Sequence, residues 1–248
     1  METVCCRDAA CTQRQGAAMK RHMLFHVCPL ISGGEVWRKH VSHIRSHAHL
    51  FNGKIVIGIV RGEGLESPET VQDAMKGISV TDWVIEGNTH VHESTTFVKM
   101  LERIQWEPGI TFRGHCKGVS HPSGKVEHEW ADVMWRICMD IKSVDKAMET
   151  HVFAGAFKIQ EGASREPDAY RWFFAGTFFW FQNAAVFARN WRAGHREWDR
   201  WYAEWWPGDL ATNKEAHCLF MDNMRRRDFR RGRWNDIVMP EFLKQVSK

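Results

Sequence analysis

The chain has 248 residues, 44% of them hydrophobic and 26% charged, and its formal net charge is +4. These values are typical of a folded globular protein with one sizeable core. No apolar run reaches the roughly 18 to 20 residues of a membrane-spanning helix, and the N-terminus lacks the continuous apolar segment of a signal peptide. We therefore expect a single cytoplasmic domain.

Strands alternate with helices through the first half of the chain. Residues 1–21 lack hydrophobic periodicity and are predicted to be a disordered leader. The β-branched run over 53–60 is typical of a strand buried on both faces, and with it we predict strands at 22–30, 53–60, 80–85 and 110–114. Helices with regularly spaced apolar residues are predicted between them, at 35–50, 67–75 and 94–105. The alternation predicts an α/β fold with a mainly parallel sheet flanked by helices.

The second half of the chain has longer and more aromatic patterns. They predict a helix over 125–149, a strand over 151–159, an aromatic strand over 171–181, a short helix over 184–191 and a helix-like segment around 215–224. A basic stretch follows. We therefore divide the chain into a leader (1–21), one folded domain (22–224) and a basic C-terminal tail (225–248).

The end of the strand predicted at 110–114 carries the first candidate site. His115, Lys117 and Gly118 follow this apolar run directly, at the edge where open α/β sheets bind ligands. His115 and Lys117 are two residues apart, so in an extended segment both side chains point to the same side and can face one anion, such as a diphosphate. The alternative is an ordinary junction between a strand and a loop, with solvated polar residues.

Several short motifs occur in one order along the chain. They are Asn88 with Glu93 behind it, His115-Cys-Lys-Gly118, Phe174-Ala-Gly-Thr-Phe-Phe-Trp-Phe-Gln-Asn183, Glu204-Trp-Trp-Pro-Gly208 and Glu215-Ala-His217. This set resembles the polysaccharide-type glycosyltransferases of bacteria and viruses that carry a His-Thr-Lys-Gly loop, and it is distantly similar to the rhamnan-synthesis glycosyltransferases. The resemblance covers roughly residues 22–224, with Cys116 where threonine is usual. It implies a glycosyltransferase-A-like, Rossmann-like fold and a nucleotide-sugar donor.

Transfer of a sugar from a nucleoside diphosphate builds negative charge on the departing phosphate, which a metal ion or fixed cations must meet. Metal-using members of this fold class place an Asp-x-Asp pair after a strand, and the sequence contains none. We therefore expect metal-independent catalysis with His115 and Lys117 as the cations. The acidic tripeptides 127–129 and 197–199 remain an alternative cation site. In the helix over 35–50, His40, His43 and His47 share part of one surface, and we interpret them as solvated surface residues rather than as metal ligands.

The remaining candidate residues surround the same loop. Asn88, Glu93 and Gly118 are expected to contact or orient the donor. A sugar or acceptor wall is expected from Gly176, Thr177 and Trp180, because an exposed tryptophan can stack on a sugar ring. A general base is needed to deprotonate the acceptor hydroxyl, and the candidates are Glu204, Glu215 and, behind them, Asp209. Surface acids near a tryptophan-rich loop are the alternative interpretation.

Partners follow from the chemistry and from the basic tail. The resemblance implies a nucleotide-sugar donor and a glycan or lipid-linked acceptor. An anionic membrane surface is a further expected partner, through six arginines that lie within nine residues: Arg225, Arg226, Arg227, Arg230, Arg231 and Arg233. Two other functions stay open, a non-catalytic sugar- or nucleotide-binding domain and a nucleic-acid-binding protein, although the net charge is small for the second.

Overall fold

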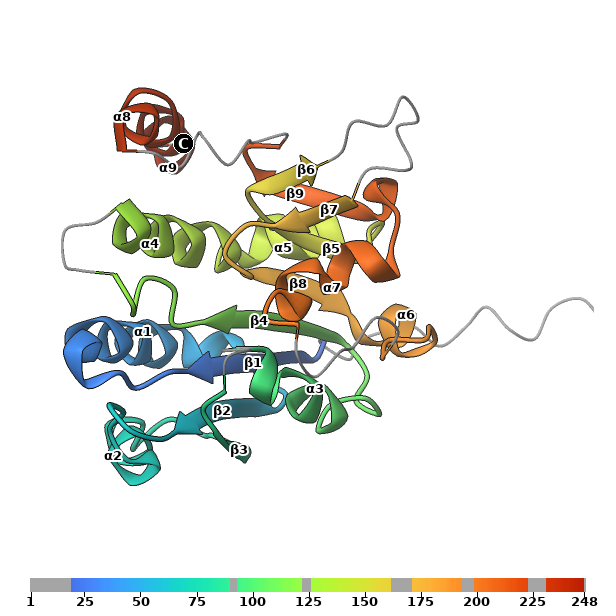
Figure 1. The fold of residues 1–248 in the computed structure, drawn as a ribbon. Coiled ribbons are helices and arrows are strands. Elements are labelled where there is room, and N and C mark those ends of the chain that lie inside the picture. Colours follow the sequence, from blue (N-terminus) through green and yellow to red (C-terminus); the bar gives the residue numbers. More distant parts are fainter. Residues whose placement is uncertain are drawn as a thin grey trace, which may run out of the picture.

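The first half of the chain forms the predicted parallel sheet. A computed structural model describes residues 19–89, 93–121, 126–161, 171–192, 199–222 and 231–247. Its first four strands are mutually parallel in the order β3-β2-β1-β4, and their bounds are Arg21–Val27 (β1), Ile55–Arg61 (β2), Asp82–Gly87 (β3) and Ile110–His115 (β4). Helices α1 (Gly34–His47), α2 (Pro68–Ala74) and α3 (Ser94–Glu102) connect them (Figure 1).

Three further strands extend the same sheet. Strand β8 (Phe179–Gln182) pairs antiparallel with β4 and with β5 (Phe153–Ala156), and β9 (Ala216–Phe220) pairs parallel with β5. The resulting order is β3-β2-β1-β4-β8-β5-β9, and a separate two-stranded sheet consists of β6 (Lys158–Glu161) and β7 (Arg171–Phe174). The predicted α/β, Rossmann-like fold class with a mainly parallel sheet is confirmed.

Four predicted elements of the second half differ from the observed ones. The aromatic strand 171–181 is two strands, β7 and β8, because the chain turns at 175–178, where Thr177 has a positive φ of 58°. Likewise, strand 151–159 divides into β5 and β6 at Phe157, whose φ is 56°. The long helix 125–149 is α4 (Val126–Cys138) and α5 (Ile141–Met148), and the helix-like segment around 215–224 contains strand β9 instead.

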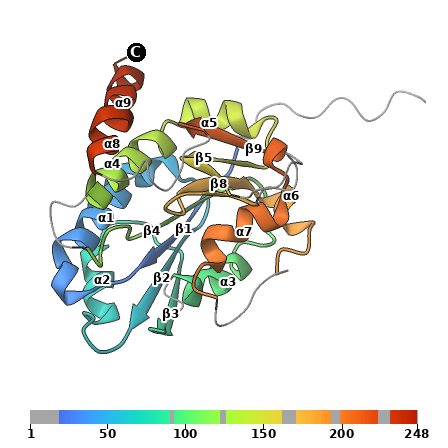
Figure 2. The same cartoon turned by 45° about the horizontal axis from the view of Figure 1, so that its top comes forward.

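Helices cover both faces of the sheet, and each face has its own apolar core. On one face, α1, α4 and α5 pack around Phe25 of β1, Trp135 and Phe112. On the other face, α3, α6 (Asn183–Phe187) and α7 (Tyr202–Leu210) pack around Phe97, Phe153 and Trp206. Figures 1 and 2 show α3 and α7 side by side on this second face. The two helices therefore form one surface over the middle of the sheet.

The C-terminal helices pack on the first core. Helix α8 (Arg231–Arg233), a π-helical turn (Trp234–Val238) and α9 (Met239–Val246) follow one another, and Trp234 and Val238 are fully buried. The indole N–H of Trp234 donates to Oε2 of Glu129 on α4, at 3.1 Å. This part of the predicted basic tail therefore belongs to the folded domain. Of the six arginines, Arg225, Arg226, Arg227 and Arg230 lie outside the described residues. Among the helices of the described ranges, none has the length and apolar character to cross a membrane.

Candidate functional site

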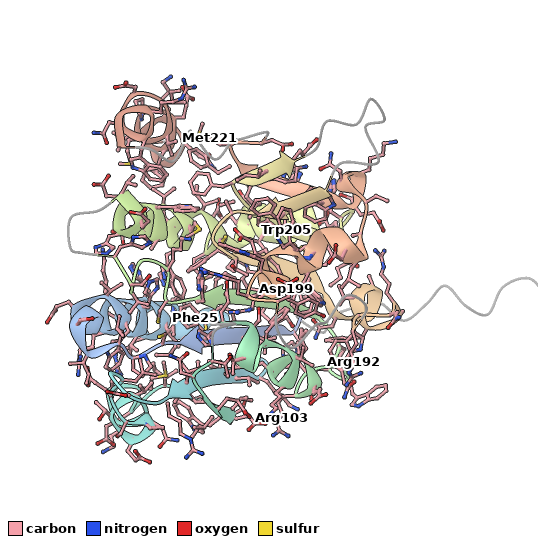
Figure 3. The ribbon with its side chains drawn as sticks, in the orientation of Figure 1. Phe25, Arg103, Arg192, Asp199, Trp205 and Met221 are labelled. Carbon is pink, nitrogen blue, oxygen red and sulfur yellow. The ribbon has the colours of Figure 1, made fainter. Side chains whose placement is uncertain are left out.

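A cleft of about 370 Å³ opens at the carboxyl ends of β1, β3 and β4. It is lined by His26 and Asn88, which lie at the end of β1 and just after β3. The loop 115–121 and the start of α7, with Trp201 and Glu204, also line it. Asp199 and Trp205, which flank this start, are labelled in Figure 3. The residues that line the cleft therefore come both from the parallel half of the sheet and from helix α7.

Most of the residues singled out from the sequence line this cleft, although they come from distant parts of the chain. They are Asn88, Glu93, His115, Lys117, Gly118, Gly176, Thr177 and Glu204. The turn 175–178 brings Gly176 and Thr177 to it, and the packing of α7 against α3 brings Glu204. The roles that we expected for these residues remain predictions, but their juxtaposition is a fact of the fold.

Glu93 connects three of the elements that surround the cleft. Its Oε2 accepts a hydrogen bond from Nη2 of Arg113 on β4 at 3.0 Å and lies 3.3 Å from Nδ1 of His115. Its Oε1 accepts from the hydroxyl of Thr177 at 3.0 Å. A threonine with positive φ is a strained conformation, which the surrounding structure must hold in place. The Glu93 carboxylate supplies one of the bonds that do so.

Arg113 is a fully buried cation in the middle of an apolar strand. Burial lowers the pKa of its guanidinium to about 10, while the Glu93 carboxylate acts in the opposite direction. Its guanidinium also donates to the carbonyl oxygen of Gly114 and lies 5.0 Å from the centre of the Phe97 ring. Arg113 therefore holds Glu93, which lines the cleft, in place through a hydrogen bond.

His115 is largely buried, with 17% of its side chain exposed. Burial, together with the positive charges of Lys117 and Arg113, lowers the pKa of its imidazole well below the usual value of 6.5. The sequence suggested two cations at this loop, but His115 is neutral at neutral pH in this structure. Its Nε2 is buried without a hydrogen-bond partner among the described residues. An unpaired buried nitrogen is costly, and a group bound in the cleft is one way to satisfy it.

Lys117 is the cation of the loop. Its ammonium nitrogen lies 4.3 Å from the centre of the Trp130 ring, and within the described ranges no carboxylate forms an ion pair with it. The loop backbone around Lys117 is fixed, because His40 donates from Nε2 to the Lys117 carbonyl oxygen at 3.0 Å. The fold favours a glycine at position 118, because a Cβ there would lie 2.7 Å from Cδ2 of His128. The loop thus holds a positive charge in a defined place.

Two of the predicted residues lie outside the cleft for clear physical reasons. Trp180 is fully buried in the core, where its indole N–H donates to the carbonyl oxygen of Cys138 at 2.8 Å, so it has no face to offer to a sugar. Glu215 precedes β9, at the amino edge of a strand parallel to β4 and thus at the opposite edge of the sheet. It pairs with Arg189 at 2.5 Å and caps the turn that begins at Thr212.

Asp209, the third candidate base, is exposed near the C-terminal end of α7. Glu204 lies in the first turn of the same helix and lines the cleft, whereas Asp209 is absent from its lining among the described residues. Of the three carboxylates considered from the sequence, Glu204 is therefore the one that the fold brings to His115 and Lys117.

Metal-ligating groups do not converge in the described part of the chain: no three His, Cys, Asp or Glu side chains there are placed to hold one ion. On α1, His40 is buried, unlike the surface residue that we expected. Its Nδ1 accepts from the indole N–H of Trp135 at 2.9 Å, which makes Nε2 the donor to Lys117. In the tripeptide 127–129, Glu129 bonds to Trp234, and the tripeptide 197–199 lies partly outside the described residues.

Several cleft residues were not identified from the sequence. His26 lies at the end of β1, in register with His115, and its Nδ1 is 2.8 Å from the hydroxyl of Thr96. Its position at the end of a buried strand was a usable signal. Arg200 and Trp201 precede α7 and also line the cleft. They lie in a tryptophan-rich segment in which exposed and buried tryptophans look alike in sequence.

Comparisons with known proteins assign the chain to no family. No protein-family model matches the chain, and no curated protein matches it. Among solved structures, a 4-diphosphocytidyl-2C-methyl-D-erythritol synthase is 12% identical, with 86% of this chain and 96% of that chain covered and a TM-score of 0.41. The synthase of the same name from Anaerococcus prevotii DSM 20548 is 10% identical, with 84% and 95% covered and a TM-score of 0.45. At these values the likeness carries no conclusion about activity.

Proposed function

We propose that this protein is a glycosyltransferase that moves a sugar from a nucleotide-sugar donor to a hydroxyl group of a glycan or lipid-linked acceptor. One observation carries the proposal: the cation Lys117 and the carboxylate Glu204 line the same cleft, at the carboxyl ends of β1, β3 and β4. This edge is where open α/β sheets bind nucleotide ligands. The reaction needs both kinds of charge, one for the leaving group and one for the acceptor.

The assignment of roles follows from the bonds that change. The acceptor oxygen bonds to the anomeric carbon of the donor sugar, while the bond from that carbon to the phosphate oxygen breaks. Negative charge grows on the departing diphosphate, and the ammonium group of Lys117 is the group that we assign to it. The proton of the acceptor hydroxyl passes to a base, and in an inverting transfer we assign this role to Glu204.

His115 and Glu93 have supporting roles in this proposal. The neutral imidazole of His115 contributes a polar contact without a charge, because its pKa is low. Glu93 is a positioning residue, since it holds Arg113, His115 and Thr177 in one arrangement. No Asp-x-Asp pair exists in the sequence, and we propose that Lys117 takes the place of a divalent metal.

A panel of nucleotide sugars tests the proposal. The purified chain is incubated with each donor, with and without simple glycoside acceptors, and the released nucleoside diphosphate is quantified. We expect release from at least one donor, and we expect the corresponding nucleoside diphosphate to raise the thermal unfolding midpoint. The Lys117→Ala variant should lose most of both effects. Absence of release and of stabilisation across the panel would contradict the proposal.

A further inference from the structure

Two tryptophans stand out by their exposure within the described ranges, Trp106 at 87% and Trp201 at 46%. Trp106 lies between α3 and β4, at the amino edge of β4, and is not part of the cleft lining. Trp201 lies directly before α7 and lines the cleft, three residues from Glu204. An isolated exposed ring needs no explanation, but a partly exposed ring in the lining of a cleft is available to contact a bound ligand.

The segment that carries Trp201 is held in place on both sides. Its backbone N–H donates to Oδ1 of Asp199 at 2.9 Å. The hydroxyl of Ser94 donates to the carbonyl oxygen of Arg200 at 3.4 Å and accepts from the N–H of Ala203 at 3.3 Å. Ser94 directly follows Glu93, so the position of Trp201 is tied to the residue that holds His115. The backbone that carries the ring is therefore fixed, so the segment loses little conformational entropy when it binds a ligand.

The immediate surroundings of the Trp201 ring define what it can bind. The guanidinium carbon of Arg200 lies 4.5 Å from the ring centre, so a cation already lies over the indole. A flat, partly exposed aromatic ring beside hydrogen-bonding groups fits the C–H face of a sugar ring, which is apolar while its edge is hydroxylated. Glu204, in the first turn of α7, supplies a hydrogen-bonding group on the same side, because residues three apart are neighbours on a helix surface.

The layout of the cleft indicates which substrate meets this ring. Lys117, which the proposed function assigns to the diphosphate, lies in the loop 115–121 that follows β4. His26 and Asn88 lie at the ends of β1 and β3, whereas Trp201 lies before α7, the helix that packs on β7 in the second half of the chain. A nucleoside attached to the diphosphate has the β1 and β3 side available to it. The α7 side is then left for the acceptor.

We propose that Trp201 is the stacking platform of the acceptor site, on which a sugar ring of the acceptor packs with a hydroxyl group directed to Glu204. This inference rests on the proposed function and adds to it the acceptor class, a glycan whose terminal or penultimate ring presents an apolar face. The acceptor of the transfer is therefore a carbohydrate group, and the ring contact selects it.

The test separates acceptor binding from donor binding. Steady-state transfer is measured with the nucleotide sugar found active in the panel and with methyl hexosides as acceptors, for wild type, Trp201→Ala, Trp201→Phe and Trp106→Ala. Loss of one aromatic contact should raise the acceptor KM about tenfold in Trp201→Ala, while phenylalanine retains part of the contact. The donor KM should stay within about twofold of wild type. Trp106→Ala should match wild type in both constants, because it removes an equally large exposed ring away from the cleft.

The outcomes distinguish failure of the Trp201 acceptor platform from failure of the proposed transferase function. An unchanged acceptor KM in Trp201→Ala, or a raised donor KM with an unchanged acceptor KM, overturns the acceptor platform while the transferase function stands. A wild type that neither hydrolyses nor transfers any donor overturns the proposed function, and the platform falls with it. Thermal unfolding of each variant is recorded alongside, and if Trp201→Ala does not fold, the comparison of Trp201→Phe with Trp106→Ala decides.

Discussion

The Glu93 carboxylate and the Arg113 guanidinium form an ion pair of 3.0 Å in which the arginine side chain has no exposure to solvent. The pair links α3 to β4 at the wall of the cleft. Removal of one member of such a pair is strongly destabilising, because the other charge then stays buried without a partner. The pair therefore couples the stability of the fold to the geometry of the site.

We predict that Glu93→Gln lowers the free energy of unfolding by about 3 kcal/mol. The matched control is Glu102→Gln on the same helix, where the ion pair with Arg192 is 43% to 48% exposed and the expected loss is below about 1 kcal/mol. Urea unfolding of both variants measures the difference. Equal losses in the two variants would show that Arg113 does not depend on Glu93.

Lys117→Ala should reduce turnover about a hundredfold, because the transition state loses roughly 3 kcal/mol of charge stabilisation at the leaving phosphate. The fold should lose little, since the contact with the Trp130 ring is worth about 1 kcal/mol. Lys99→Ala is the control, because it removes the same charge from a half-exposed lysine of α3 that pairs with Glu86 of β3.

A chelator added to the wild-type assay completes this experiment. If Lys117 replaces a metal ion, the rate should be unchanged after chelation. A rate that the chelator abolishes and that Lys117→Ala retains would contradict the assignment, and a metal would then have to be held by an acidic group of the chain.

The low pKa of His115 predicts how kcat/KM for the donor depends on pH. A charged imidazole would make kcat/KM for the donor fall as the pH rises from 6 to 8, because the cation would be lost. Since the pKa of His115 is well below 6.5, the imidazole is neutral across this range, and we expect no such fall from this residue. A fall in wild type that disappears in His115→Gln would show that His115 acts as a cation.

The parallel half of the fold could be predicted from the sequence, whereas much of the second half could not. The continuous β-branched run in β2 has one simple interpretation, a strand buried on both faces. The run Arg171 to Phe181 is equally apolar, but a turn with strained backbone at Thr177 divides it between two sheets. The local signal of that turn is a single glycine, Gly176, whose φ is positive, and one of the bonds that hold Thr177 comes from Glu93, far away in the chain.

The candidate site, too, could be predicted only in part, because contacts between distant parts of the chain decide which residues reach it. His115 and Lys117 could be placed because they directly follow a strand, and the end of a parallel strand is a defined edge of the sheet. Glu204 and Glu215 look alike in sequence, and only the direction of β9 shows that Glu215 lies at the other edge. Trp180 and Trp201 are also indistinguishable without knowing which one the core encloses.

The buried His40 predicts a loss of stability at acid pH. Burial lowers its pKa from 6.5 to about 4, so between these values the unfolded chain binds a proton that the folded chain does not. The contribution of His40 to the free energy of unfolding should therefore be constant above pH 6.5. It should fall by about 3 kcal/mol as the pH drops to 4. Urea unfolding at several pH values measures the slope. In His40→Gln the slope should be shallower, and an unchanged slope would assign the pH dependence to other groups.

Gly208 of α7 fixes how closely this helix approaches β7. A Cβ at this position would collide with the carbonyl oxygen of Trp172, a backbone atom that cannot move aside cheaply. We predict that Gly208→Ala costs about 3 kcal/mol of stability, the upper range for an overpacked interface. Thermal or urea unfolding measures this cost. Because α7 carries Glu204 into the cleft, transfer activity should also fall under conditions in which the variant is folded.

Gly232→Ala provides the control for the Gly208 prediction. Gly232 is also helical, but a Cβ there meets no atom of the described residues within 4 Å. Alanine is the better helix former, so this change should raise stability by about 0.5 kcal/mol. The two substitutions are chemically identical, and their opposite signs would isolate the contact between α7 and β7. If both variants are more stable than wild type, α7 has room to shift on the sheet, and the fixed positions of Glu204 and Trp201 at the cleft would lose their structural basis.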